Sequence, residues 1–99
     1  MVTDDSHAQP LLELSACRAA IEALDTQLVA MLAERLTLSR RTATLKHAAG
    51  LPLLDPGREA EVIRRVSESA RQHDLPPDAI REIWWRVIGL CRGAQQDAT

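Results

Sequence analysis

The feature that most constrains the fold is a long segment in which apolar residues recur every three or four positions. It runs from Leu11 to Ala49 without a Pro or a Gly, and Gly50 is a natural helix stop. Such spacing is typical of one face of a helix. We therefore predict a helix of about 35 residues, about 52 Å long. Its stripe consists of Leu14, Cys17, Ile21, Leu24, Leu28, Met31, Arg35, Leu38, Thr42 and Leu45.

The rest of the chain predicts two shorter helices and no sheet. The sequence has 99 residues, which is enough for one domain. Its only aromatic residues are two Trp, and this argues against a sheet because sheets favour aromatic and β-branched residues. Asp55-Pro56 is a good helix start, and this second helix should end near His73-Asp74. The third should begin within Leu75–Asp78 and fade near 93–96. We predict an all-α chain of three helices.

Each shorter helix has an apolar face of its own, but a helix as long as the first cannot be covered by the other two. We therefore expect a second copy of the chain to cover it, in an intertwined antiparallel homodimer. The buried face of the second helix should consist of Val62, Ile63, Val66 and Ala70. The apolar positions of the third helix are Ile80, Ile83, Trp84, Val87, Ile88 and Cys91.

Composition also limits the compartment and the partners. Residues 1–10 resemble no signal peptide and are predicted to be a disordered tail, followed by one helical domain over 11–99. No apolar run is long enough to cross a membrane. Because the sequence shows no signal peptide, we expect a cytoplasmic protein whose two cysteines are reduced thiols. The 12 basic and 14 acidic residues are balanced, which argues against nucleic-acid binding. The histidines lack the spacing of a metal site.

Two cationic residues lie on or beside the long apolar stripe. Arg35 takes a place where the period asks for an apolar residue, and Lys46 follows eleven residues, or about three turns, later. Arg35 could simply form an internal ion pair or extend to solvent from the edge of the stripe. Alternatively, both side chains converge on one small anion. Arg18 is too far along the same helix to join them, but in an antiparallel pair crossing near residue 29 it would lie level with position 40 of the partner.

Two weaker groups of residues lie in the other helices. Asp55, Arg58 and Glu59 stand at the start of the second helix, where backbone N–H groups favour anions. They could equally serve only to cap the helix and complement its dipole. Cys91 and Gln95 share one face of the third helix at a spacing of four. Gln95 is either a plain helix-end residue or a neutral hydrogen-bond donor in a cationic site.

Together these residues resemble the all-helical, AroQ-type chorismate mutases. The resemblance runs from about Leu11 to Gln95. Its individual short motifs, such as Leu-Ala-Glu-Arg, are common in helices and carry little information alone. The ordered set is specific. It consists of Arg18, Ala33-Glu34-Arg35, Lys46 eleven residues later, Asp55-Pro-Gly-Arg58-Glu59 and Gln95.

The resemblance implies an intertwined dimer that rearranges chorismate to prephenate without a metal or cofactor. In this family pattern Arg35 and the partner's Arg18 would clamp the two substrate carboxylates, and Lys46 and Gln95 would donate to the ether oxygen. Arg58 would add positive potential. Asp55 and Glu59 would hold the ring hydroxyl. Cys91 occupies the position at which members of this family commonly have a serine that contacts a carboxylate.

Three other functions stay open at this point. Isochorismate-pyruvate lyases generally lack the Asp and Glu that this chain has at Asp55 and Glu59. A mutase of 4-amino-4-deoxychorismate is compatible with Glu59, since a carboxylate can pair with an ammonium. A non-catalytic dimerisation module would have no need for inward-facing cations at Arg35 and Lys46.

Overall fold

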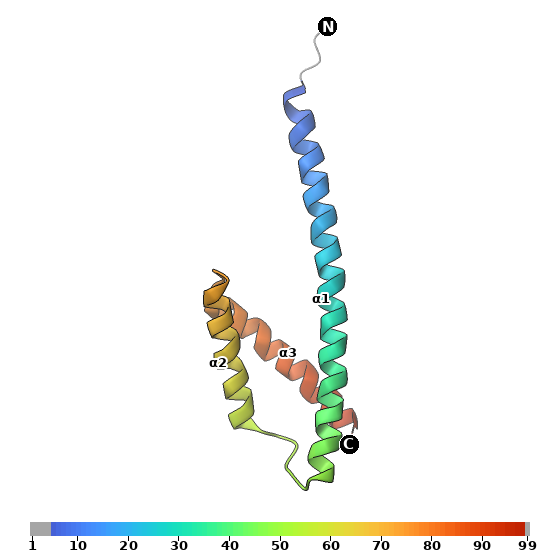
Figure 1. The fold of residues 1–99 in the computed structure, drawn as a ribbon, viewed down its shortest axis with the longest axis vertical. Coiled ribbons are helices and arrows are strands. Elements are labelled where there is room, and N and C mark those ends of the chain that lie inside the picture. The colour runs from blue at the N-terminus through green and yellow to red at the C-terminus, as the bar shows by residue number, and fades with distance from the viewer. Residues whose placement is uncertain (1–4, 99) are drawn as a thin grey trace. The chain divides into compact units, whose positions relative to one another are not determined.

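The chain is α-helical in a computed structural model that describes residues 5–98 (Figure 1). A short 3₁₀ turn, η1, covers Asp5–His7 and leads into α1, Ala8–Ala48. The other two helices are α2, Pro56–Gln72, and α3, Pro77–Ala98. Over the described residues there is no strand. The expected all-α chain of three helices with a very long first helix is confirmed.

α1 has 41 residues and is longer than predicted at its N-terminus. It begins at Ala8 rather than Leu11, so that Pro10 lies in the first turn, where its missing N–H leaves no hydrogen bond unmade. Of the predicted tail 1–10, residues 1–4 lie outside the described part of the chain. At the other end Gly50 adopts φ of 70°, and hydrogen bonds from Gly50 N to His47 O (3.1 Å) and from Leu51 N to Lys46 O (2.8 Å) close the helix.

α2 begins and ends as its sequence predicts. Pro56 is its first residue, and the Asp55 carboxylate accepts a hydrogen bond from Arg58 N at 3.0 Å. After the last turn Asp74 has φ of 55°, with Asp74 N bonded to Arg71 O (3.2 Å) and Leu75 N to Ala70 O (2.8 Å). This closure is the same as that of α1, except that a residue with a side chain occupies the left-handed position.

Replacing Asp74 by Gly is therefore expected to stabilise the chain. A left-handed backbone costs about 1–2 kcal/mol for a residue with a Cβ, less for Asp, and Gly removes this cost while making the unfolded chain more flexible. The net gain expected is about 0.5 kcal/mol in the free energy of unfolding, measured by urea denaturation. Asp74→Ala is the matched control and should lose stability. A less stable Asp74→Gly variant would show that the side chain, and not the backbone, governs this turn.

The chain divides into an N-terminal unit, residues 1–33, and a C-terminal unit, residues 34–99. In the C-terminal unit α2 packs on α3 (Figure 1). Seven apolar residues and one serine are buried among the described residues. They are Ala43, Ile63, Ser67, Ala70, Val87, Ile88, Cys91 and Ala94.

The predicted faces of α2 and α3 differ from this core in a few places. Val62, Val66, Ile80 and Trp84 are only half-buried. Ile83, one of the apolar positions of the third helix, is 52% exposed. It lies seven residues before Leu90, which is also exposed, so the two share a flank of α3 away from the core.

In the N-terminal unit, the apolar stripe of α1 is exposed along its length. Leu14, Ile21, Leu24, Leu28 and Met31 are 43–62% exposed. Contiguous apolar surface of this kind marks an interaction surface in proteins. No helix in the described part of the chain meets the length and apolarity that a membrane span requires.

Candidate active site

A cavity of about 480 Å³ lies in the C-terminal unit, in the usual size range of a small-molecule site. All three helices and the connector 49–55 contribute to its wall. The lining residues are Arg35, Leu38, Ser39, Thr42, Lys46, Leu53, Leu54, Asp55, Arg58, Glu59, Val62, Ile88, Cys91, Arg92, Gln95 and Gln96.

Most of the residues predicted from the sequence to form a site line this one cavity. They are Arg35, Lys46, Asp55, Arg58, Glu59, Cys91 and Gln95. The exception is Arg18, which belongs to the N-terminal unit and is not part of this wall. The spacing of eleven residues does direct Arg35 and Lys46 of α1 into the same cavity.

The charged residues of the wall are mostly basic. Four cationic side chains, those of Arg35, Lys46, Arg58 and Arg92, face two carboxylates, Asp55 and Glu59. Apolar side chains such as Val62 and Ile88 complete the lining. A partly enclosed wall of low polarity strengthens the field of such charges, so the cavity is suited to a small anion that carries more than one negative charge.

Arg35 reaches across from α1 to α3. Its Nη1 donates to the Sγ of Cys91 at 2.8 Å, and the thiol is buried. A guanidinium has five N–H donors, so this contact leaves donors available to a ligand. The contact explains why a charge can sit at a stripe position: its side chain turns into the cavity instead of into an apolar core.

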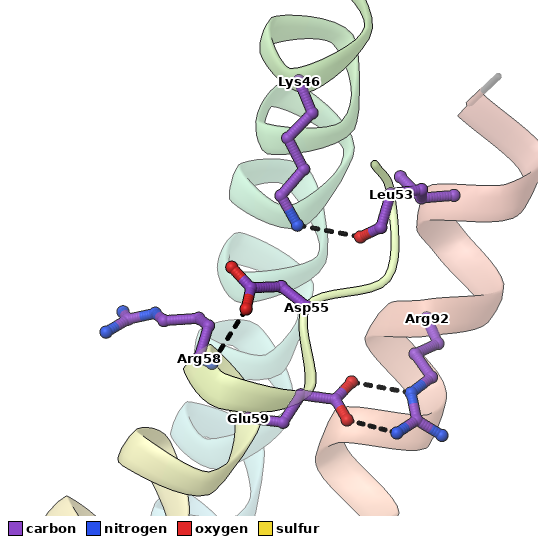
Figure 2. Close-up of polar contacts among 6 residues, drawn as sticks. All are labelled: Lys46, Leu53, Asp55, Arg58, Glu59 and Arg92. Carbon is purple, nitrogen blue, oxygen red and sulfur yellow. Dashed lines mark hydrogen bonds and ion pairs between the residues drawn. The ribbon is translucent and has the colours of Figure 1, made fainter. Parts of the chain in front are cut away.

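Lys46 is half-buried and holds the connector that precedes α2. Its Nζ donates to the backbone oxygen of Leu53 at 2.9 Å (Figure 2). An ammonium has three donors and can bind a ligand while keeping this contact. The hydrogen bond links the end of α1 to the segment that leads into Asp55.

The first turn of α2 presents two further charges at the cavity. The carboxylate of Asp55 is engaged in capping the helix, and Figure 2 shows the Arg58 guanidinium extending away from Glu59 and Arg92. Arg58 Nη1 lies 3.5 Å from the Glu61 carboxylate, and its side chain is 54% exposed. Arg58 thus lies at the solvent edge of the cavity.

Glu59 and Arg92 form an ion pair between α2 and α3. Arg92 Nε donates to Glu59 Oε2 at 2.7 Å, and Nη2 donates to Oε1 in a second, parallel bond (Figure 2). The hydrogen bond from Arg92 lowers the pKa of Glu59 below its ordinary value, and the charges of Arg92 and Lys46 act in the same direction against partial burial. The same hydrogen bond raises the pKa of Arg92. Glu59 is therefore a carboxylate with a fixed orientation.

Sequence reasoning missed several polar residues of the wall. Thr42 was placed in the stripe of Arg35 but was given no role in a site. Ser39 follows Arg35 by four positions, so helical periodicity could have placed it on the same face. Arg92 and Gln96 gave no such signal. Arg92 is adjacent to Cys91, and its pairing with Glu59 depends on how α2 packs against α3.

Residues 17–96 match the family described as chorismate mutase type II, which is most of the chain. The chain belongs to the chorismate mutase type II family. The resemblance seen in the sequence is confirmed, and the match includes every residue of the cavity wall.

Three relatives illustrate this membership in the chorismate mutase type II family. The T-protein of Enterobacter agglomerans is 36% identical over 76 residues, which are 77% of this chain and 20% of that protein. The chorismate mutase of Methanocaldococcus jannaschii is 29% identical over 63 residues, 64% of each chain. The 4-amino-4-deoxychorismate mutase of Streptomyces venezuelae is 32% identical over 81 residues, 81% of this chain and 79% of its own. The chain thus spans about a fifth of the T-protein.

Proposed function

We propose that this chain is a chorismate mutase that converts chorismate to prephenate. The observation that carries the proposal is the cavity in which Arg35, Lys46 and Gln95 face a space of about 480 Å³. Chorismate is a dianion with two carboxylates and an ether bridge, and its rearrangement is intramolecular. The protein has to hold the folded conformer and to stabilise the charge that grows on the ether oxygen.

The cations of the cavity divide these tasks between them. Arg35 binds one substrate carboxylate through the fork of its guanidinium, and Cys91 lies at the same carboxylate as a weak thiol donor. Lys46 and Gln95 donate to the ether oxygen, whose negative charge increases in the transition state. Arg58 adds positive potential at the edge of the cavity. No side chain has to form a covalent bond.

The ring hydroxyl of the substrate is assigned to the first turn of α2. Asp55 supplies its backbone N–H there, while its carboxylate caps the helix, as its bond to Arg58 N supports. Glu59 accepts a hydrogen bond from the hydroxyl. A carboxylate has about four lone-pair positions, so the two bonds from Arg92 leave room for this one.

The second carboxylate is assigned to Arg18 of a partner chain in an antiparallel homodimer. The exposed apolar stripe of α1 supports this arrangement, because a second copy of the helix would cover it. A two-fold axis near residue 29 would bring Arg18 level with position 40 of the partner, between Arg35 and Lys46. Sedimentation equilibrium should give the mass of two chains, and a monomer at micromolar concentration would contradict the arrangement.

The deciding test compares the rates with chorismate, 4-amino-4-deoxychorismate and isochorismate. The relative from Streptomyces venezuelae makes the amino compound the leading alternative substrate. We expect the highest kcat/KM with chorismate. The conversion of chorismate is monitored by the loss of its absorbance. Faster turnover of either other compound would replace the proposed substrate, and no turnover of any would favour a non-catalytic module.

Gln95→Glu is expected to make the reaction dependent on low pH. A protonated carboxyl donates to the ether oxygen as the amide does, whereas a carboxylate repels the developing charge. The variant should retain most activity near pH 4 and lose about 100-fold or more by about pH 7.5. The matched control is Gln72→Glu, at the exposed end of α2 and outside the cavity wall. A Gln95→Glu variant that is fully active at neutral pH would remove the ether-oxygen role.

A further inference from the structure

The ion pair between Glu59 and Arg92 is a strong polar contact inside the cavity that the family pattern did not lead us to expect. Both partners line the cavity, and both oxygens of Glu59 receive a bond from Arg92. The Glu59 side chain is 17% exposed and that of Arg92 is 46% exposed. A bidentate pair fixes the carboxylate plane in a way that a single hydrogen bond does not.

The charge of Arg92 alters what Glu59 can bind. An unpaired carboxylate in a cavity attracts an ammonium more strongly than a hydroxyl, because the ammonium carries a full opposite charge. When Arg92 lies against the same carboxylate, the pair is neutral as a whole. An ammonium placed there would gain little attraction, would lose its hydration and would lie close to the like charges of Arg92 and Lys46.

A neutral hydroxyl meets none of these costs. It donates one hydrogen bond to a lone pair of Glu59 that Arg92 does not use, and the carboxylate stays ionised because Arg92 and Lys46 favour its charged form. The preorganised carboxylate gives such a donor a strong, directed hydrogen bond. The pair thus distinguishes two ligands of almost the same shape.

We propose that Arg92 is a specificity-determining residue, which acts through Glu59 to favour a substrate with a ring hydroxyl over one with an ammonium at the same position. The inference deepens the proposed function and rests on it. It assigns the preference for chorismate over 4-amino-4-deoxychorismate to the pairing of Glu59 with Arg92, since Glu59 alone is compatible with both.

The test measures kcat/KM for both substrates in the full-length protein and in three variants. Arg92→Met removes the charge and keeps the length of the side chain, while Arg92→Lys keeps the charge and loses the two-pronged geometry. The matched control is Arg86→Met, an exposed arginine of α3 that does not line the cavity. Circular dichroism and sedimentation establish that each variant folds, and Arg92→Gln replaces Arg92→Met if the latter does not.

We expect the ratio of kcat/KM for the amino compound to that for chorismate to rise about tenfold in Arg92→Met, which corresponds to about 1.4 kcal/mol. Arg92→Lys should stay within about threefold of the wild-type ratio, since the charge remains. The control should keep the wild-type ratio. A merely structural role of Arg92 would lower both values together and leave the ratio unchanged.

A pH profile supplies a second readout. Loss of Arg92 removes the main cause that lowers the pKa of Glu59, so this pKa should rise. The acid limb of kcat/KM for chorismate should then move to higher pH in Arg92→Met, because Glu59 becomes protonated earlier as the pH falls. Arg92→Lys should show a smaller shift, and Arg86→Met none.

The outcomes separate the two proposals. If the wild type turns over chorismate and the ratio is unchanged in Arg92→Met, the role of Arg92 is overturned while the proposed function stands. If the wild type turns over neither substrate, the proposed function fails and this inference fails with it. A raised ratio together with a shifted acid limb supports both.

Discussion

Replacing Lys46 by Ala is expected to lower kcat/KM for chorismate by about 10²–10³, with the loss mainly in kcat. Removing one preorganised donor to a developing oxyanion has an effect of this size in other enzymes. Lys46 is the only lysine of the chain, and its ammonium is half-buried in the cavity. We expect the proposed dimer to stay intact, because Lys46 does not belong to the apolar stripe.

A second effect of Lys46→Ala has to be separated from the loss of charge. The hydrogen bond from Nζ to Leu53 O also disappears, which could loosen the connector 49–55. Lys46→Gln retains a donor but has no charge, so it should keep the stability of the wild type and still lose most of the activity. Arg41→Ala, on an exposed part of the same helix, is the control for a general change of charge. If Lys46→Gln kept most of its activity, the positive charge would not be the catalytic feature.

The local signals in the sequence predicted the helices well. Asp55-Pro56 begins α2 and Gly50 ends α1 because capping depends on a few neighbouring residues and on backbone conformation. The shared direction of Arg35 and Lys46 likewise follows from helical geometry alone. These features require no knowledge of how one helix packs against another.

The contacts between helices could not be predicted in this way. Glu59 and Arg92 are 33 positions apart, and Arg35 and Cys91 are 56 apart, so each pair meets only through the packing of separate helices. Periodicity shows which face of a helix is apolar, but not which residue of a neighbouring helix stands opposite. Ile83 illustrates the same limit, since it has the spacing of a core residue and lies on the exposed flank of α3.

The proposed role of Arg18 predicts a second large effect. Two variants that are each nearly inactive should regain activity when their chains form a mixed dimer. Arg18→Ala and Arg35→Ala should each lose about 100-fold or more in kcat/KM, because each removes one clamp on a substrate carboxylate. If each active site takes Arg18 from one chain and Arg35 from the other, a heterodimer of the two variants has one site with both substitutions and one site with neither. Two-fold symmetry requires this distribution.

Co-expression of the two variants with different affinity tags allows the heterodimer to be isolated. It should have about half the activity of the wild-type dimer, and a statistical mixture should have about a quarter, because half of its dimers are mixed. Recovery on this scale from two nearly inactive chains cannot arise when both arginines act within one chain, since no site would then be intact. A heterodimer of Arg18→Ala with Arg18→Ala,Arg35→Ala is the control, and it should stay inactive because every Arg18 is lost. If the first heterodimer were equally inactive, Arg18 would not act across the dimer, and the second carboxylate would have to be bound by a cation of the same chain, with Arg58 the first candidate.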